Sequence, residues 1–494
     1  MNLRSVLSAV PYLSRISSVL RDKKTEGWLV GGFLRDAFLE ISRPLVDFDF
    51  CLSSHTGASA REIARRIDGR FLVLDTTNET YRVVKKRRGR VYTYDFSRMR
   101  GEDIAEDLAR RDFTINMLAV SLTARPRRLV DVHGSRKDLR QGLIRALSAE
   151  VFRADPLRIL RAYSFMARYS FRIEAITRRV ARETGPMLTE VSGERLQEEL
   201  YKIFAAPTAS PAVKLMSEDR VLDHIIPEVS AARGVHQGGY HHLDVWRHSL
   251  EAFTKCEQLW KRKFCRHPKI SGYLKRTVGA GHSRLQTVKF ACLLHDLGKP
   301  EAKEITPRRT IFHTHEKIGA GHVENICRRL RISQKETEAL KKLVYWHLRP
   351  GYLADQHLPS QRALYRFGRD AGEETVAVLV LSLADWRATR GPLVDTKKRQ
   401  RHERIMVQLI EYYLREKEKK PLPKLLDGHL LMRLFRLRPS PLVGEILRAV
   451  EEEQKIGTVS TRDQAEEFAR EFIRVRRENG QGGDHARGNT GNPD

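Results

Sequence analysis

The sequence predicts an α+β fold, with a mixed sheet and helices at the N-terminus followed by helical domains over the rest of the chain. Residues 46–50, Val-Asp-Phe-Asp-Phe, alternate in polarity, which is typical of a half-buried strand. Residues 27–36 read as a short apolar strand, a Gly31-Gly32 turn and a helix start. Beyond residue 150, apolar residues recur at helical spacing. A chain of 494 residues exceeds one core, so we expect roughly two to four domains.

Two carboxylates on the first of these segments suggest a metal site. Because side chains alternate along a strand, Asp47 and Asp49 project to one face while Phe48 and Phe50 anchor the other. Mg²⁺ prefers carboxylates plus substrate phosphate, and a metal pair can stabilise the attacking and leaving oxygens of a phosphoryl displacement. The glycine turn suits a triphosphate. Together these parts indicate nucleotidyl transfer, although each motif alone is more often a solvated strand face or a plain turn.

The order of these motifs resembles the class II tRNA nucleotidyltransferase and bacterial poly(A) polymerase superfamily, in which a Gly-Gly-x-x-Arg-Asp loop precedes an Asp-x-Asp strand. Residues 110–116, Arg-Arg-Asp-Phe-Thr-Ile-Asn, look like the second motif of that family. The resemblance implies that Asp47 and Asp49 are catalytic and bind Mg²⁺. It implies nucleotide binding by Gly31, Gly32, Arg35, Arg111, Asp112, Asn116, Asp155, Arg158 and Arg161.

Residues 155–162, Asp-Pro-Leu-Arg-Ile-Leu-Arg-Ala, resemble the family's neck motif, in which an acid and an arginine read the incoming base. The i,i+3 spacing predicts that Asp155 and Arg158 share one helical face, where both can pair with a base edge. A plain ion pair on a solvated helix is the alternative. Ala154 stands where relatives often carry Glu, so base selection can differ in detail. Ser192 is expected to cap the next neck helix.

The stretch after the Asp-x-Asp strand predicts two further strands, over 80–85 and 91–96, joined by the basic turn 86–90. Only a short linker follows. Many CCA-adding relatives insert a flexible loop there, which the family associates with the switch from C to A addition. Because the loop is abbreviated, full CCA addition, C or A addition alone, and poly(A) addition all stay open. Asp95 is a candidate third acid, with a solvated strand residue as the alternative.

A second group of His and Asp residues lies on apolar helical segments from residue 241 onward. His248, the pair His295-Asp296 followed by Leu-Gly-Lys, and Asp385 resemble the HD phosphohydrolase domain. The resemblance implies that they bind a transition metal such as Ni²⁺, Mn²⁺ or Co²⁺. Further histidines would suit a second ion; they are His315, His322 and His347. The implied activity is that of a phosphatase or 2′,3′-cyclic phosphodiesterase, and helix packing without metal is the alternative.

The composition favours a polyanionic partner. Lys and Arg number 90 against 62 acids, which gives a net charge of +28. Nucleic acid fits better than a membrane, because no basic segment carries a strongly apolar face. Basic runs lie along predicted helices at 61–66, 153–172, 255–275 and 397–404. RNA bound along them would be sensitive to salt.

The five cysteines are scattered and lack metal-ligand spacing, which favours a reducing compartment. No stretch approaches the roughly 20 apolar residues of a membrane helix. The first 20 residues show no signal for secretion. We therefore expect a cytoplasmic protein without membrane contact, and the oligomeric state stays open.

These observations divide the chain into a catalytic head (1–125), a helical neck (126–230), an HD domain (231–395), a C-terminal helical region (396–477) and a disordered tail (478–494). The expected function is template-independent addition of CCA, or part of it, to tRNA 3′ ends from CTP and ATP, with an appended HD phosphohydrolase. The alternatives are a poly(A) polymerase, a specialised C-adding or A-adding enzyme, and an HD hydrolase or RNA-binding protein with a vestigial head.

Overall fold

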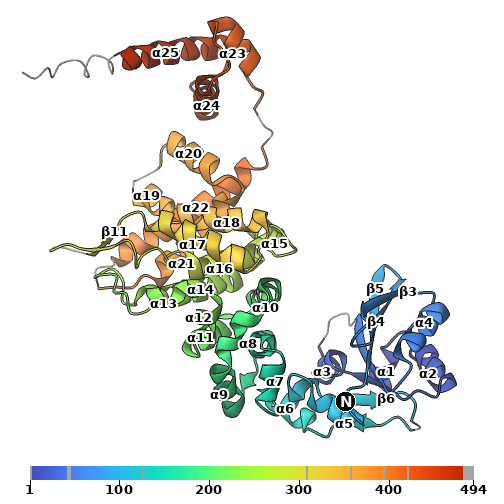
Figure 1. The fold of residues 1–494 in the computed structure, drawn as a ribbon. Coiled ribbons are helices and arrows are strands. Elements are labelled where there is room, and N and C mark those ends of the chain that lie inside the picture. Colours follow the sequence, from blue (N-terminus) through green and yellow to red (C-terminus); the bar gives the residue numbers. More distant parts are fainter. Residues whose placement is uncertain are drawn as a thin grey trace, which may run out of the picture. The chain divides into compact units, whose positions relative to one another are not determined.

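The chain forms two compact units in a computed structural model (Figure 1). The first comprises Met1–Ser230 and Arg328–Ile332, and the second comprises Ala231–Cys327 and Ser333–Asp494. The structure describes residues 3–41, 46–124, 126–307, 310–355, 359–392, 395–419 and 422–481. The division of the chain into head, neck, HD domain and C-terminal region stays a prediction.

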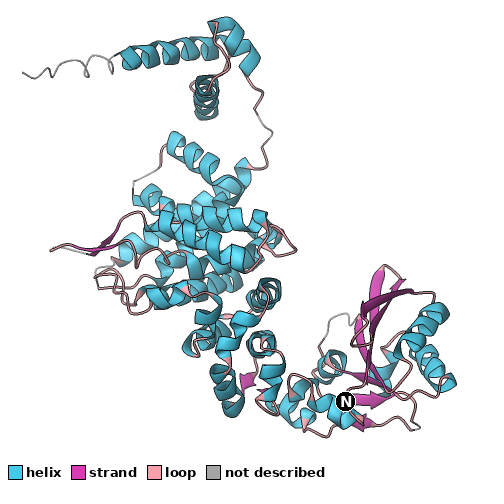
Figure 2. Ribbon diagram, in the orientation of Figure 1, coloured by secondary structure: helices cyan, strands magenta, loops and turns pink. Residues whose placement is uncertain are grey.

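Within the described part of the first unit, one sheet holds seven strands in the order β3-β4-β5-β2-β1-β6-β7 (Figure 2). They are β1 Gly27–Val30, β2 Asp47–Leu52, β3 Arg70–Asp75, β4 Thr80–Arg87, β5 Arg90–Arg98, β6 Ala119–Ser121 and β7 Leu129–Val130. Strand β2 runs parallel to β5 and antiparallel to β1. The mixed sheet and the predicted strands are confirmed, and β7 continues the sheet beyond residue 125.

The core of the head lies on the aromatic face of β2. Phe48 and Phe50 are each 1% exposed, as their alternation with the acids predicts. The ring of Phe48 stacks on Tyr94 of β5 with centroids 5.4 Å apart. Helix α4 (Thr56–Ile67) packs against β4 and β5, and α2 (Leu13–Asp22) packs on α4. The two carboxylates of β2 therefore lie on the opposite face of the sheet from these helices.

Helices make up the rest of the first unit. They are α1 Leu3–Ser8, α3 Gly32–Phe38, α5 Ile104–Ala109, α6 Ser135–Gln141, α7 Glu150–Ala154, α8 Leu157–Tyr169, α9 Ala175–Glu183, α10 Gly193–Ala205, α11 Ser210–Glu218, α12 Val221–Ile225 and α13 Glu228–Ala232, the last reaching the start of the second unit. Two short strands, β8 Leu143–Ile144 and β9 Arg172–Ile173, pair in parallel. Ser192 occupies the N-cap of α10 as predicted, but its hydroxyl makes no capping hydrogen bond.

The neck motif differs from its prediction. Helix α7 ends at Ala154, Asp155 is extended with φ −155°, and α8 starts only after Pro156. The cause is Pro156, whose ring disfavours the helical conformation in the residue before it. Asp155 and Arg158 therefore do not share a helical face, and that prediction is wrong.

The second unit is helical around the buried α21 (Thr375–Ala388). Its other helices are α14 Val245–Arg262, α15 Pro268–Lys275, α16 Arg284–Leu294, α17 His315–Arg329, whose end belongs to the first unit, α18 Gln334–Trp346, α19 Arg349–Asp355, α20 Gln361–Ala371 and α22 Thr396–Glu416, with a hairpin of β10 Lys303–Ile305 and β11 Thr310–Phe312. Helices α14, α16 and α22 pack against α21. Helix α22 thus joins this core, although the sequence placed the end of the HD domain at residue 395.

The C-terminal region has a core of its own. Helices α23 (Gly428–Phe435), α24 (Pro441–Ile456) and α25 (Arg462–Gln481) bury Leu431 and Ile446 among other apolar residues. Residues 478–481 of the expected tail belong to α25, and residues 482–494 lie outside the described residues. No helix in the described ranges combines the length and the apolarity needed to cross a bilayer.

We expect Phe50→Ala to lower the free energy of unfolding of the head by about 3–5 kcal/mol, because it leaves a cavity under the acid-bearing strand. Val73→Ala on β3, where the side chain is 50% exposed, is the control and should stay within about 0.5 kcal/mol. Limited proteolysis of the head in graded urea measures both. Similar losses for the two variants would contradict this account of the core.

Candidate active sites

The two acids of β2 lie beside two polar residues of β5. Asp47 lies opposite Thr93 and accepts a hydrogen bond from its hydroxyl, while Asp49 lies opposite Asp95. Asp95 accepts two hydrogen bonds from Arg82 of β4, at 2.8 and 2.7 Å. Asp95 thus stands next to the acid pair as expected, but an arginine already holds its carboxylate. A catalytic role for Asp95 stays a prediction.

The electrostatics around Asp49 favour a cation. Neighbouring protein atoms keep much of the bulk water away from the Asp49 carboxylate, although solvent still reaches it, and this desolvation raises its pKa. The nearby Arg111 lowers the pKa, whereas repulsion from Asp95 and Asp47 raises it further. A divalent cation would relieve the crowding of negative charge. Exposed carboxylates that share one face are also the oxygen ligands that Mg²⁺ accepts. The residues present therefore fit a magnesium site.

The glycine turn lies directly against Asp49. Gly31 has φ 77°, and a Cβ atom there would lie 3.1 Å from Oδ2 of Asp49 and 3.5 Å from Nη1 of Arg111. A side chain at this position would thus fill the space beside the acid and strain the backbone. Arg111 donates from Nη2 to Asp107 at 3.1 Å, and its Nε is buried without an acceptor among the described residues. The turn and the cationic Arg111 therefore both lie directly beside Asp49.

A hydrogen-bonded network, which we call the head–neck network, joins this turn to α8. Arg35 of α3 donates to Asn116 at 2.6 Å, and Asn116 donates to Asp112 at 2.8 Å. Arg161 of α8 donates to the other oxygen of Asp112 at 2.7 and 3.0 Å. Residues from three separated segments of the sequence are thereby held in one chain of charge-assisted hydrogen bonds, which are stronger than neutral ones.

A second connection closes this network. Tyr169, two turns after Arg161 on α8, donates to Asp36 at 2.8 Å, and Asp36 also accepts from Arg35 at 2.8 Å. The guanidinium of Arg35 lies 5.1 and 4.9 Å from the ring centroids of Phe165 and Tyr169. One face of α8 is therefore fixed to the head at both ends.

Most members of this network are buried. Arg35, Asn116 and Asp112 are 6%, 6% and 7% exposed. Burial alone would raise the pKa of Asp112, but Arg161 and the Asn116 amide outweigh it and hold that pKa below its usual range. The sequence assigned Arg35, Asp112, Asn116 and Arg161 to the nucleotide. The structure joins them by hydrogen bonds within the protein, and their contact with a nucleotide stays a prediction.

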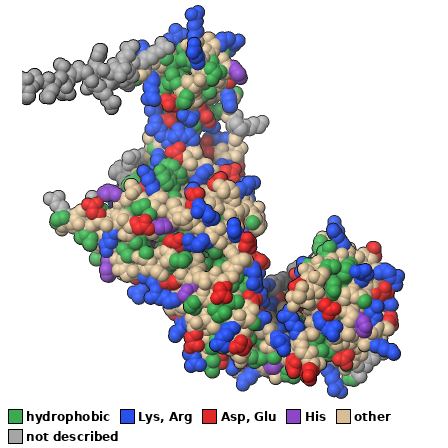
Figure 3. All heavy atoms as spheres, viewed as in Figure 1, with side chains coloured by type: hydrophobic (Ala, Val, Ile, Leu, Met, Phe, Trp, Pro, Cys, Tyr) green, Lys and Arg blue, Asp and Glu red, His purple; other side chains and the backbone are tan. Residues whose placement is uncertain are grey.

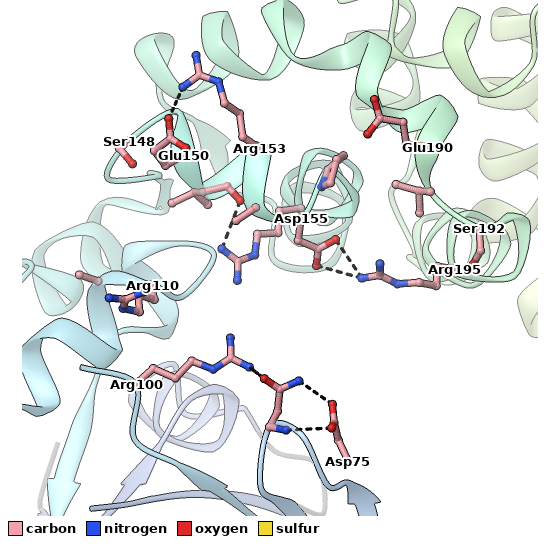
Figure 4. A pocket seen from close by; sticks show the side chains of 17 residues that line it. Asp75, Arg100, Arg110, Ser148, Glu150, Arg153, Asp155, Glu190, Ser192 and Arg195 are labelled. Carbon is pink, nitrogen blue, oxygen red and sulfur yellow. Dashed lines mark hydrogen bonds and ion pairs between the residues drawn. The ribbon is translucent and has the colours of Figure 1, made fainter. Parts of the chain in front are cut away.

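A cavity of about 1060 Å³ lies between the head and the neck within the first unit (Figure 4). The head contributes Arg100 and Arg110, and the neck contributes Asp155, Arg158 and Arg195. Asp155 points toward Arg195 in Figure 4, and Nη2 of Arg195 lies 3.0 Å from both of its oxygens. Asp155 is therefore paired with a different helix, α10, and not with Arg158.

Arg158 offers donors to this cavity. Burial lowers its pKa from the usual arginine value, although Asp112 and Asp155 nearby favour the charged form. Its Nη1 donates to the Val151 carbonyl at 3.3 Å. Sequence reasoning missed Arg100, Arg110 and Arg195 as pocket residues. The only signal for Arg195 was its place in the helix that Ser192 was expected to cap.

The second unit brings together the four residues predicted for the HD site. His248 Nε2 lies 2.7 Å from Asp385 Oδ1 and 3.8 Å from Asp296 Oδ2. His295 Nε2 lies 3.2 Å from Asp296 Oδ2 and 3.7 Å from Asp385 Oδ1. The ligand atoms of His248, His295 and Asp296 lie within 4.8 Å of one another. These residues come from distant segments, so the predicted constellation is a real cluster.

A second group shares Asp296. The Nε2 atoms of His315 and His347 lie 3.5 and 3.7 Å from Oδ1 of Asp296, and 3.4 Å from each other. These two histidines belong to the predicted flanking set. His322 of the same set pairs instead with Glu301 at 2.7 Å. Asp296 thus lies where two ligand groups meet.

The orientation of the imidazoles supports metal binding. Nδ1 of His295, His315 and His347 lies 3.0, 2.8 and 2.6 Å from the carbonyl of the residue three positions earlier. A carbonyl only accepts, so Nδ1 carries a proton and Nε2 is the nitrogen that faces the cluster. Metal-binding histidines show this arrangement. Nε2 of His295 is buried without a hydrogen bond among the described residues.

The charges of the cluster agree with a cation at its centre. Burial alone would lower the pKa of His295, but Asp296 and Asp385 outweigh it and raise the pKa to about 10. Burial, with repulsion from His295 and His315, lowers the pKa of His347 to about 3. The site therefore combines carboxylates that attract a cation with a neutral imidazole that can bind one.

Comparison with known proteins agrees with both sites. Residues 27–145 match the poly A polymerase head domain, residues 170–233 match a domain described as the probable RNA and SrmB-binding site of polymerase A, and residues 245–390 match the HD domain. The A-adding tRNA nucleotidyltransferase of Deinococcus radiodurans is 32% identical over 90% of this chain and 95% of its own length. The chain belongs to the tRNA nucleotidyltransferase and poly(A) polymerase family. It is a nucleotidyltransferase that also carries an HD domain.

Further relatives of this nucleotidyltransferase share its whole length. The CC-adding tRNA nucleotidyltransferase of Geobacter sulfurreducens is 32% identical over 94% of this chain and 96% of its own. A solved CCA-adding enzyme with ATP superposes with a TM-score of 0.67 at 20% identity, over 96% of this chain and 99% of its own. The Thermotoga maritima CCA-adding enzyme in complex with tRNA gives a TM-score of 0.64 at 20% identity, over 94% and 97%. The predicted family and fold class are confirmed.

We expect Asp112→Ala to lower the free energy of unfolding by an amount near the lower end of the range of about 3–5 kcal/mol. The reason is that Arg161 then loses its carboxylate partner in a largely buried site. Glu183→Ala is the control, since its pair with Arg179 is exposed and 3.8 Å long, and it should cost under about 1 kcal/mol. Thermal unfolding of the two variants measures the difference. Equal losses would show that the head–neck network does not stabilise the unit.

Proposed function

We propose that this nucleotidyltransferase adds CCA, or part of it, to the 3′ end of tRNA without a template, using CTP and ATP. The observation that carries the proposal is the glycine turn against Asp49, in the same unit as a cavity lined by cationic side chains. In the proposed reaction the RNA 3′-hydroxyl attacks the α-phosphate of the nucleotide and pyrophosphate leaves. A tRNA substrate also implies that the protein works in the cytoplasm.

Each group of residues has a role in this proposal. Asp47 and Asp49 would hold Mg²⁺, which when bound activates the hydroxyl and stabilises the leaving pyrophosphate. Arg111 faces the turn at Gly31 and would neutralise part of the triphosphate. The remaining step is the choice of base, which we assign to the residues that line the cavity.

The cavity offers hydrogen-bonding groups suited to a base edge. Arg158 presents guanidinium donors, and Asp155 presents a carboxylate whose position Arg195 sets. A polar base edge left without its partner costs about 1–3 kcal/mol, which is enough to discriminate between bases. Because the walls belong to the protein, selection needs no template strand. The head, neck, HD domain and C-terminal region remain our proposed functional parts.

One observation favours partial addition. Strand β5 ends at Arg98 and α5 starts at Ile104, so only residues 99–103 stand where many relatives carry a flexible loop. The family resemblance ties that loop to the switch from C to A addition. An A-adding relative and two CC-adding relatives match 90%, 94% and 89% of this chain, so the relatives do not decide between C and A addition. On the short linker alone we propose addition of the C residues as the leading activity within CCA synthesis.

Four tRNA substrates, ending before CCA, after C, after CC and after CCA, test this proposal with CTP, ATP or both. We expect C addition to the first two from CTP, and little A addition to the third. Efficient A addition to the third would show full CCA or A-only activity, and continued extension of the fourth with ATP would show a poly(A) polymerase. No incorporation under any condition would contradict nucleotidyl transfer to tRNA.

We expect Asp47→Asn and Asp49→Asn each to reduce incorporation by about 10³-fold or more, because metal-assisted charge stabilisation contributes several kcal/mol. Binding of tRNA should remain close to that of the wild type. Asp68→Asn, an exposed acid of the head paired with Lys85, is the control and should retain full activity. Near-normal incorporation by both active-site variants would refute their assignment.

We propose a metal-dependent phosphohydrolase activity for the HD site, with Ni²⁺, Mn²⁺ or Co²⁺ as the metal. His248, His295, Asp296 and Asp385 would hold the first ion, and His315 with His347 would help to hold a second. Mixed imidazole and carboxylate ligands favour a transition metal over Mg²⁺. Such an ion, when bound, supplies Lewis acidity and an activated water. The substrate would be a phosphate monoester or a 2′,3′-cyclic phosphate at an RNA end.

We expect the double variant His295→Ala and Asp296→Ala to lose both bound transition metal and phosphoester hydrolysis while nucleotide addition continues. His322→Ala is the control, because His322 pairs with Glu301 outside the cluster. Elemental analysis and hydrolysis of a generic phosphoester measure the two properties. Metal content and hydrolysis that survive the double change would show that these residues only pack the helices.

A further inference from the structure

The basic turn predicted at 86–90 forms a hairpin tip that neither site explains. Strands β4 and β5 are joined through Arg88 and Gly89, with φ 48° and 76°, and Arg87 lies directly opposite Arg90. Such turns favour Asn or Gly at the left-handed positions, and like charges opposite each other destabilise a hairpin. The arginines of this tip therefore act against folding of the hairpin, which points to a role outside folding.

The cations of the tip are exposed and lack acid partners. Lys and Arg side chains are spread over the face drawn in Figure 3, so a basic side chain alone marks no site. On the nearby helix α4, Arg65 pairs with Glu62 at 2.8 Å. In the ranges that the structure describes, Lys86, Arg88 and Arg90 are exposed and form no ion pair. Their charge is available to an external anion.

The register of the sheet places the tip close to the catalytic acids. Thr93 lies opposite Asp47, so Val91 precedes the level of the acids by two residues. That separation is about 7 Å at about 3.3 Å per residue. Lys86 lies opposite Val91, and strand alternation puts both on the face that carries the acids, whereas Arg90 lies on the other face. Val91 is 50% exposed, so this part of the face is open.

The strand order indicates which substrate passes the tip. Strand β2 lies between β1, which ends at the Gly31 turn, and β5, which begins at the tip. Arg111 lies on the β1 side, next to Gly31. In an in-line displacement the attacking and leaving oxygens lie on opposite sides of the phosphorus. With the triphosphate on the β1 side, the attacking RNA end comes from the β5 side.

We propose that Lys86 and Arg88 bind the sugar–phosphate backbone of the RNA close to its 3′ end. The proposal rests on the proposed function and names the surface that guides the RNA to the acids. Contacts to phosphates position an RNA without reading its sequence, which suits an enzyme whose RNA substrates differ in sequence.

A matched pair of variants tests this contact. Lys86→Gln with Arg88→Asn removes two charges from the tip, and Asn suits the left-handed position at residue 88. Arg21→Gln with Lys24→Asn is the control: it removes two exposed charges near α2, and Lys24 has φ 50°. Binding of tRNA without its CCA end is measured without nucleotide, at about 50 to about 200 mM salt. Thermal unfolding checks that both variants fold.

For the tip variant we expect the slope of log affinity against log salt to fall by roughly 1.4–1.8, because each lost phosphate contact removes about 0.7–0.9. The loss of RNA affinity of the tip variant relative to the wild type should then become about tenfold smaller over this fourfold rise in salt concentration. The control should bind as the wild type does. At saturating RNA, kcat and the KM for nucleotide should be unchanged in the control.

Three results would overturn the proposal. Unchanged RNA binding in the tip variant would show that the tip does not bind RNA. An equal loss of RNA affinity in the control would show a general effect of net charge. A raised KM for nucleotide with normal RNA affinity would assign the tip to the triphosphate. Failure of the wild type to extend tRNA would overturn the proposed function, whereas the binding slopes test the tip independently of catalysis.

Discussion

The arrangement of the first unit depends on the head–neck network, which holds α8 against the catalytic sheet. Through Asn116 and Asp112 the network joins Arg35, directly below the glycine turn, to Arg161 on α8. Tyr169 and Asp36 close it from the other end of the same helix. Arg158, which lines the cavity, lies on the first turn of this helix. Any movement of α8 would therefore shift Arg158, for which we propose a role in base selection, relative to the acids.

The two units use different chemistry for their metals. The head offers exposed carboxylates on a strand, beside a glycine turn, which suits a hard ion shared with a substrate phosphate. The HD cluster is buried and imidazole-rich, and backbone carbonyls orient three of its rings. The two activities that we propose would therefore not compete for one metal. Because the ligand sets share no residue, substitutions should separate the activities.

The sequence predicted most of what depends on local patterns. Alternation in β2 and the His-Asp motif identified the acids and the HD cluster. Prediction from the sequence failed where a contact joins distant segments or where one residue overrides a local pattern. Pro156 broke the expected helix at Asp155, and no spacing rule could show that Asp155 pairs with Arg195 or that Asp95 is held by Arg82. Buried roles for Arg35, Asp112 and Asn116 likewise follow only from packing.

The central claim is that the protein itself selects the base, through a cavity whose walls the head–neck network holds in place. The most direct test compares single-turnover incorporation of CTP with that of UTP for the wild type and Asn116→Ala, which interrupts the network without touching the cavity. We predict that discrimination falls by roughly tenfold, equivalent to about 1.4 kcal/mol, while tRNA affinity is unchanged. Discrimination equal to that of the wild type would contradict the claim.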